Sequence, residues 1–169
     1  MFRVEKTNAR IPSDGVIAAL TVLDGVNRVQ GLELGVAGRL TRNWQVSVGY
    51  SYLESKIEKT TVAADLGKEL PGTPPHNLTV WTTYDVTSAW TIGRGAFYQA
   101  RAWTNTANTN FVPEYVRLDA MASYKVTSNA TLQLNLYNLT DVLYYSQYYA
   151  GHAVPAAGRS ASLSLKMRW

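Results

Sequence analysis

The stretch GRSASLSLKMRW, residues 158–169, alternates strictly between apolar and polar side chains from Ser160 onward. Successive side chains of an extended strand point to opposite faces, so this stretch predicts a strand with one apolar face and one polar face. The apolar positions are Ala161, Leu163, Leu165, Met167 and Trp169, and the polar positions are Ser160, Ser162, Ser164, Lys166 and Arg168. Whether the apolar face meets lipid or a protein core decides the fold class.

The same alternation recurs along the rest of the chain. Further alternating segments lie at residues 29–40, 44–53, 77–86, 90–103, 115–126 and 131–137, and residues 1–7 resemble part of another strand. Each segment has the length and period of a half-buried strand. We therefore predict an all-β protein of about eight antiparallel strands.

The connections between these segments alternate between short and long. Tight turns are expected at residues 41–43, 87–89 and 127–129, and long connections at residues 8–28, 54–76, 104–114 and 146–158. In an up-and-down sheet, this order places all tight turns at one end. Short periplasmic turns and long extracellular loops are typical of a transmembrane antiparallel β-barrel of the bacterial outer membrane. A helical membrane protein is excluded, because no apolar stretch approaches the roughly 18 residues that a spanning helix needs.

The aromatic residues support a lipid-facing surface. The chain has 11 Tyr and 5 Trp but only 3 Phe, and amphipathic rings suit a membrane interface. A second aromatic group falls toward the long connections and comprises Tyr50, Tyr52, Tyr98, Tyr144 and Tyr145. The first group lies beside the tight turns, on the apolar face, and comprises Trp44, Tyr84, Trp90, Tyr124 and Trp169. We expect this first group to form the periplasmic aromatic girdle, in contact with outer-membrane lipid.

Two points stay open at this level. A water-soluble barrel or sandwich also alternates, with its apolar face turned onto a core. Arg94 has the parity of the lipid face, where a basic residue near the midplane costs roughly 2–4 kcal/mol. A bulge between Arg94 and Phe97, beside Gly93 and Gly95, would turn its side chain inward.

Composition and motifs argue against several other functions. The net charge is +4 with scattered Lys and Arg, which does not favour a nucleic-acid partner. The absence of cysteine excludes thiolate metal sites and thiol nucleophiles. His76 and His152 lie in expected loops without neighbours at metal-ligand spacing. We expect no enzyme activity, no catalytic residue, no metal site and no cofactor.

Four stretches resemble the barrel of TonB-dependent outer-membrane receptors, in particular catecholate-type ferric siderophore receptors. They are NRVQGLELGVAGRLTRNWQVSVGYSYLESKI (27–57), GKELPGTPPHNLTVWTTY (67–84), YVRLDAMASYKVTSNATLQLNLYNLTDVLYY (115–145) and AVPAAGRSASLSLKMRW (153–169). The resemblance covers nearly the whole chain, in family order and spacing. It implies that residues 1–169 are the C-terminal part of such a barrel, in the outer membrane of a Gram-negative bacterium.

The resemblance also implies partners and missing parts. The plug domain, TonB box and signal peptide of the family are not found in this sequence, so we expect contact with the TonB complex only through an absent N-terminal part. The implied ligand is a ferric siderophore, taken up by the complete receptor. The terminal strand, with Leu163, Leu165, Met167 and Trp169, would be the signal read by the barrel assembly machinery. A self-contained eight-stranded structural barrel is the alternative, since eight is the smallest size that closes.

Candidate ligand-facing residues follow from the charge of a ferric catecholate. An anionic chelate favours cationic and aromatic neighbours above the rim of the barrel. The candidates are Arg101, Trp103, Arg117, Tyr148 and Tyr149. The alternative is that these side chains only stabilise the loops or the barrel wall.

Overall fold

The computed structural model describes residues 1–13, 21–149 and 152–169, and it excludes the side chain of Tyr149. These residues form one eight-stranded antiparallel sheet in the order β1-β2-β3-β4-β5-β8-β9-β12. Two small hairpins and a 3₁₀ turn, η1 (Ala63–Asp65), lie in the connections. The hairpins pair β6 (Ala102–Trp103) with β7 (Phe111–Val112), and β10 (Tyr145–Tyr149) with β11 (His152–Pro155). The sheet strands are β1 (Phe2–Pro12), β2 (Thr21–Arg39), β3 (Trp44–Lys59), β4 (His76–Asp85), β5 (Trp90–Gln99), β8 (Tyr115–Lys125), β9 (Ala130–Tyr137) and β12 (Ser160–Met167).

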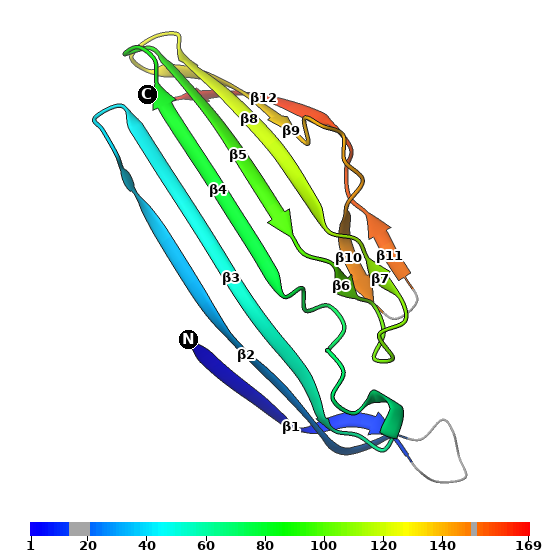
Figure 1. Cartoon of the computed structure of the whole chain (residues 1–169). Helices are drawn as coiled ribbons and strands as arrows, with labels where there is room; N and C mark the ends of the chain where they lie inside the picture. Colours follow the sequence, from blue (N-terminus) through cyan, green and yellow to red (C-terminus); the bar gives the residue numbers. More distant parts are fainter. Residues whose placement is uncertain (14–20, 150–151) are drawn as a thin grey trace.

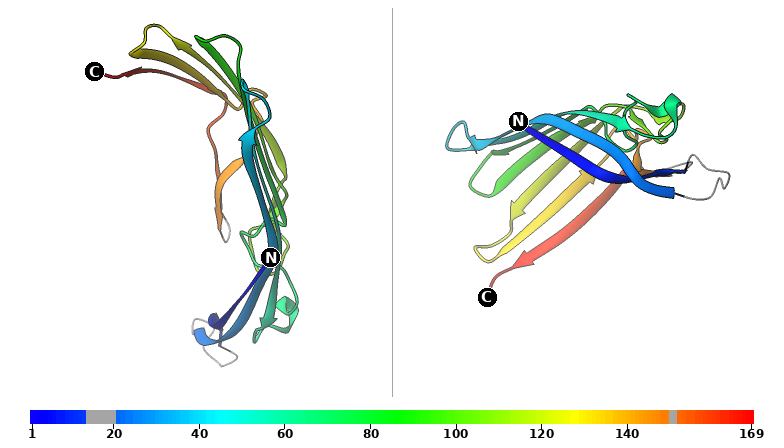
Figure 2. Two further views of the ribbon diagram at one scale, coloured as in Figure 1. Left: turned by 90° about the vertical axis from the view of Figure 1, so that its left-hand side faces the viewer. Right: turned by 90° about the horizontal axis from the view of Figure 1, so that it is seen from below.

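The sheet is a single curved layer with two open edges. Figure 1 shows the tight turns and the C-terminus at one end, and the long connections at the other. The sheet bows, and the β10–β11 hairpin lies on its hollow side (Figure 2). In the part of the chain that the structure describes, β1 and β12 are edge strands that do not pair with each other. The all-β antiparallel fold is confirmed, but the alternative of a closed eight-stranded barrel is wrong.

The three tight turns share one local structure. Each begins with a threonine whose hydroxyl accepts a hydrogen bond from the backbone two residues on: Asn43 N to Thr41 Oγ1 (3.3 Å), Ala89 N to Thr87 Oγ1 (3.2 Å) and Asn129 N to Thr127 Oγ1 (3.2 Å). Such bonds hold the chain in a turn instead of letting the strand continue. The turns therefore form where the sequence predicts them.

One face of the sheet is apolar and remains uncovered. On this face, which we call the apolar face, Val36 is 73% exposed and Leu163 is 67% exposed. The buried apolar residues among those described lie in β1, the end of β3 and the long connections, not between two layers. The soluble sandwich or barrel is therefore wrong, because the described residues form no second layer over these side chains. Within the described ranges, no helix has the length and apolar composition needed to cross a membrane.

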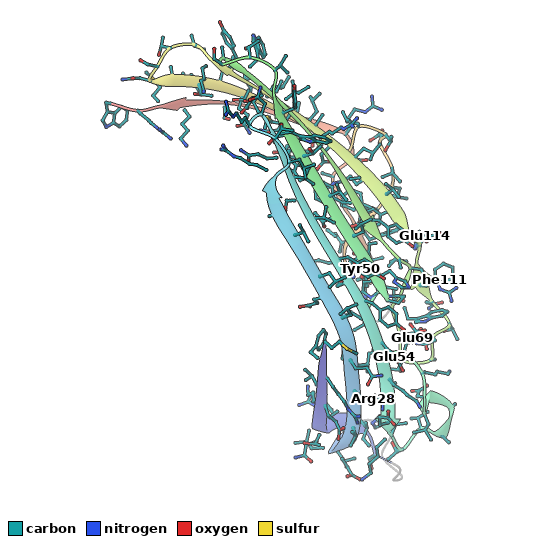
Figure 3. The ribbon with its side chains drawn as sticks, turned by 60° about the vertical axis from the view of Figure 1, so that its left-hand side comes forward. Arg28, Tyr50, Glu54, Glu69, Phe111 and Glu114 are labelled. Carbon is teal, nitrogen blue, oxygen red and sulfur yellow. The ribbon has the colours of Figure 1, made fainter. Side chains whose placement is uncertain are left out.

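Three strands run further than the alternation predicts, and the first is β1, which continues past residue 7 to Pro12. β2 begins at Thr21 and β3 continues to Lys59, so parts of the expected loops 8–28 and 54–76 are strand. Beyond Tyr52, the positions on the apolar face become charged. There, Arg28 approaches Glu54 (3.9 Å) and Glu58 (2.9 Å), and Figure 3 shows Arg28 and Glu54 on these extended strand ends. The ladder continues past the apolar band into a charged, water-compatible region.

Arg94 lies on the apolar face. The register around it is unbroken, with Arg94 opposite Thr82 on β4 and opposite Ala120 on β8. The bulge that would turn the side chain inward does not form. Gly93 and Gly95 instead make room for Trp81 on the opposite face, because a Cβ at Gly95 would overlap the Trp81 ring.

Candidate ligand-binding surface

The face opposite the apolar face, here called the polar face, carries a cluster near the long connections. Tyr115 on β8 lies opposite Gln99 on β5. The Tyr115 ring packs against the Tyr144 ring in a tilted arrangement, with 4.9 Å between ring centroids. Gln99 Nε2 donates to the hydroxyl of Tyr148 (3.1 Å), which fastens the β10–β11 hairpin to the sheet. Together with Ser146, these side chains line a pocket of about 480 Å³.

Arg117 belongs to this cluster, but its charge is neutralised. Its Nε and Nη2 donate to the two carboxylate oxygens of Asp119 (3.1 and 3.0 Å), and Nη1 donates to the hydroxyl of Tyr144 (3.1 Å). The guanidinium also lies 4.5 Å from the Phe97 ring centroid. A bidentate ion pair of this kind leaves little positive potential for an external anion. These contacts make Arg117 part of the wall of the sheet, and its candidacy as a ligand-facing residue stays a prediction.

Asp119 also holds the turn that follows β9. Asp119 is 4% exposed, and its Oδ1 accepts the backbone N–H of Asn138 (2.9 Å). Asn138 is fully buried with φ of 53°. Its side-chain Nδ2 donates to the carbonyl of Val142, and its Oδ1 accepts from the N–H of Val142. Asparagine tolerates this left-handed conformation better than most residues. The stretch YNLTD is therefore a turn locked onto β8.

Arg101 forms a second group with Trp103 and Phe111, which face each other in the β6–β7 hairpin. The Arg101 guanidinium lies 4.9 Å from the Trp103 ring centroid and 6.0 Å from that of Phe111, and the two rings meet edge to face. Arg101 is exposed, and the described residues give it no carboxylate partner. Figure 3 shows Phe111 and Glu114 at the long-connection end. Arg101 thus keeps a positive charge beside aromatic surface.

Hydrogen bonds from a neighbouring connection order the loop that carries this group. The side chain of Asn108 donates to the backbone of Glu69 (3.0 Å) and accepts from its N–H (3.0 Å). Lys68 Nζ donates to the carbonyl of Ala107 (2.7 Å), and Gly72 N–H donates to that of Trp103 (2.9 Å). The loop is therefore preorganised, which lowers the entropy cost of binding a ligand.

Of the two candidate tyrosines in β10, the structure describes the side chain of Tyr148 but not that of Tyr149. Tyr148 is half-buried, and burial raises the pKa of its phenol above 10.0, while the hydrogen bond from Gln99 opposes the shift. The phenol is therefore a neutral hydrogen-bonding group at physiological pH. The side chain of Tyr149 lies outside the described residues, so its candidacy remains a prediction.

The raised pKa of Tyr148 predicts a pH effect. A tyrosine whose folded pKa exceeds its unfolded value stabilises the docked hairpin fully below the unfolded pKa, and this stability is lost as pH rises through the folded pKa. In the complete receptor carrying ring-labelled tyrosine, we expect the Tyr148 NMR signal to titrate with a midpoint above 10.0. The Tyr148→Phe variant identifies the signal, and a midpoint at or below 10.0 would contradict the docking.

Sequence reasoning missed an apolar group on the polar face. Trp81, Phe97 and Met121 have the parity of the polar face, and they surround Gly93 and Gly95 at positions where a Cβ would crowd them. The alternation had assigned mainly polar residues to this face. Trp81 was the available signal, because it breaks the polar series of β4 at an odd position.

The predicted girdle residues lie at one end of the sheet. Trp44 is paired with Tyr84, and Trp90 is paired with Tyr124 with 4.6 Å between ring centroids. Trp169 follows β12 at the same end (Figure 1). On β12, the apolar positions Leu163, Leu165 and Met167 lie opposite Leu134, Leu132 and Ala130 of β9.

His76 contacts aromatic side chains in the structure. His76 Nδ1 shares a hydrogen bond with the Tyr50 hydroxyl (2.9 Å), and its ring packs on Tyr52. Across the described ranges, no three His, Cys, Asp or Glu side chains are placed to hold a metal ion. The surface therefore offers recognition groups, namely an exposed cation, aromatic rings and neutral hydroxyls.

These features match a family of membrane receptors. Residues 4–139 match the family model described as TonB dependent receptor-like, beta-barrel. The chain belongs to this family. Proteins of the family reside in the outer membrane of Gram-negative bacteria, which locates the sheet in that membrane.

Several relatives are similar to this chain. It is 40% identical over 180 residues, covering 100% of the chain, to the protein named "Probable TonB-dependent siderophore receptor PiuA" of Acinetobacter baumannii. It is 36% identical over 125 residues, 71% of the chain, to the catecholate siderophore receptor Fiu of Escherichia coli K12. These alignments cover 24% of PiuA and 16% of Fiu. The chain therefore spans about a quarter or less of the length of these relatives.

Solved structures agree with the fold. The crystal structure of PiuA superposes with a TM-score of 0.88 at 39% identity, covering 98% of this chain and 25% of that chain. The closed form of the ferric-catecholate import receptor Fiu gives a TM-score of 0.80 at 31% identity, covering 98% of this chain and 24% of that chain. The ferric yersiniabactin receptor FyuA of Yersinia pestis, at 14% identity and a TM-score of 0.82, shares the fold.

Proposed function

We propose that this chain is the C-terminal part of the barrel of an outer-membrane receptor that imports ferric siderophores of the catecholate type. The observation that carries the proposal is the 40% identity to a siderophore receptor along the whole chain. The resemblance to Fiu, which is named a catecholate receptor, supports the ligand class. In this proposal the strands form part of a barrel wall, and transport is energised by TonB acting through an N-terminal part outside this sequence.

The open edges of the sheet support a larger barrel. A strand edge exposed to hydrocarbon leaves backbone groups without partners, at a cost of several kcal/mol for each group. β1 and β12 need neighbouring strands in the membrane, and this chain does not supply them to each other. We therefore expect the chain alone not to transport, and we propose no enzymatic activity for it.

The dimensions of the apolar face suit contact with lipid, and the residue pattern of the last strand suits recognition during barrel assembly. On β3, the apolar positions run from Trp44 to Tyr52, and Glu54 begins the charged extension. Nine residues of tilted strand match the thickness of the hydrocarbon layer. We propose that the Trp44–Tyr84 and Trp90–Tyr124 pairs lie at the periplasmic interface. We further propose that the alternating apolar residues of β12, with Trp169, are read by the barrel assembly machinery.

Arg101 is the strongest ligand candidate on this surface. It combines an exposed guanidinium with the Trp103 ring at 4.9 Å, and it stands on a loop held by hydrogen bonds. An anionic chelate with catechol rings can contact both groups at once. Arg117 is a weaker candidate, because Asp119 already occupies its guanidinium.

Replacing Arg101 by Ala in the complete receptor should weaken ferric catecholate binding by about tenfold, the loss expected for one charge-assisted contact. The measurement is the Kd from fluorescence quenching of the purified receptor by the iron chelate. Arg42→Ala is the matched control, since Arg42 lies in a tight turn at the other end of the sheet. Equal affinity of the Arg101 variant and the wild type would remove Arg101 from the binding surface.

The function itself is tested by uptake of radioactive iron into cells. Cells that carry the complete receptor should import iron supplied as a ferric catecholate, and cells deleted for the receptor gene should not. An iron hydroxamate serves as the control chelate. Equal import by both strains would refute the proposed function, and import of the hydroxamate alone would refute the ligand class.

A further inference from the structure

Arg94 is a charged side chain on a face that is otherwise apolar. The outward positions of the neighbouring strands at the same level are Val46 on β3, Thr82 on β4 and Ala120 on β8. Between the Trp44 level and the Tyr52 level, the apolar face of the described strands β2–β5, β8, β9 and β12 carries no other Asp, Glu, Lys or Arg. Charged residues facing lipid are rare, and they usually serve a function.

A shallow pocket lies beside the Arg94 side chain. It has a volume of about 370 Å³ and is lined by Trp44, Thr82, Tyr84, Ile92 and Arg94, with parts of Thr83 and Gly93. Trp44 Nε1 donates to the Thr82 hydroxyl (2.6 Å), which fixes the indole as one wall of the pocket. The pocket therefore combines one cation with two aromatic rings and aliphatic surface.

Within the described ranges, the Arg94 guanidinium has no counter-charge. Among the described residues it forms no ion pair or side-chain hydrogen bond, and no acidic residue lines the pocket. Arg94 is one outward position away from the Trp44–Tyr84 pair, which is about 7 Å along the strand. An arginine stem can extend over such a distance and bring its charge to the level of the lipid headgroups.

We propose that Arg94 and this pocket bind the phosphate of an anionic phospholipid from the periplasmic leaflet. The guanidinium pairs with the phosphate in its bidentate geometry, Trp44 and Tyr84 flank the headgroup, and the acyl chains lie along the apolar face. Because the pocket offers no carboxylate to an ammonium headgroup, phosphatidylglycerol is favoured over phosphatidylethanolamine. The inference rests on the proposed orientation of the sheet and is independent of which siderophore the receptor binds.

The test is native mass spectrometry of the complete detergent-purified receptor titrated with dioleoylphosphatidylglycerol. Arg94→Gln should bind this lipid about tenfold more weakly than the wild type. Lys125→Gln is the matched control: it removes a positive charge near the same end of the sheet, but from the polar face. The control should retain wild-type lipid binding. Heat-modifiable gel mobility shows whether each variant is folded.

Several outcomes would overturn the inference. They are equal lipid binding by the Arg94 variant and the wild type, an equal loss in the Lys125 variant, and tighter binding of phosphatidylethanolamine. Complete displacement of the lipid by millimolar inorganic phosphate would identify a site for the free ion instead. Iron uptake by the Arg94 variant is a separate readout, so a failure here is distinguishable from a failure of the proposed function.

Discussion

Replacing Asp119 by Ala is expected to destabilise the complete receptor by about 3 kcal/mol, the lower end for a broken buried ion pair. The substitution leaves Arg117 without its carboxylate and also leaves the buried N–H of Asn138 without an acceptor. The estimate takes the lower end because the Arg117 side chain is 25% exposed, so water recovers part of its solvation. The turn of the YNLTD stretch should loosen together with β8.

The measurement is the midpoint of urea unfolding in detergent. The loss of heat-modifiable gel mobility reports the unfolded fraction at each urea concentration. Asp24→Ala is the control, because Asp24 pairs with Lys59 while its side chain is 63% exposed. An exposed pair contributes about 0–1 kcal/mol, so this variant should unfold near the wild-type midpoint. If the Asp119 and Asp24 variants shifted the midpoint equally, the buried network around Asp119 would contribute no more to stability than an exposed ion pair.

Replacing Gly31 by Ala should destabilise the receptor by about 2 kcal/mol or more, in the range of overpacked interiors. A Cβ at this position would overlap the backbone carbonyl oxygen of Tyr52 on β3. A flexible side chain could move aside, but a carbonyl in a paired strand moves only with its strand. The glycine of the RVQGLEL stretch is therefore required by the close approach of β2 and β3.

Gly35→Ala is the matched control on the same strand. A Cβ at Gly35 would meet no atom within 4 Å, and Gly35 is paired with Gly49. We expect this variant to be as stable as the wild type or slightly more so, since alanine loses less conformational entropy on folding. Urea unfolding of both variants provides the comparison. Similar midpoints for Gly31→Ala and the wild type would show that β2 and β3 can move apart at Gly31 without loss of stability.

The sequence could predict the membrane band of the fold, but it could not predict the regions beyond that band. Alternation identified β3 up to Leu53, because its outward residues there are apolar. Further along, Glu54 and Lys56 replace them while the backbone ladder continues, so the hydrophobic pattern ends before the strand does. The alternating segment 90–103 leaves the sheet at Gln99, and Ala102–Trp103 pair with β7 in a short hairpin instead. The β10–β11 hairpin lies in a connection where no period-two pattern marks a strand.

The candidate surface was predicted only in part, because charge pairing depends on neighbours in space. Arg117 and Asp119 are two residues apart on one strand, so they share a face, and this spacing could have revealed their pairing. The docking of Tyr144 and Tyr148 on the sheet depends on the path of a long connection. Nothing in the sequence specifies that path. Arg94 was ambiguous because the adjacent glycines suit either a bulge or the close packing of Trp81.

The two unpaired edges have a consequence for the chain outside a membrane. β12 is eight residues long and pairs with β9 on one side, so the backbone donors and acceptors of alternate residues face its open edge. Three of its outward side chains are Leu163, Leu165 and Met167. Such an edge is a template on which another copy can add its own strand, and the apolar face then buries itself against further copies. Synthesised alone in the cytoplasm, this polypeptide should accumulate as inclusion bodies rich in intermolecular β-structure.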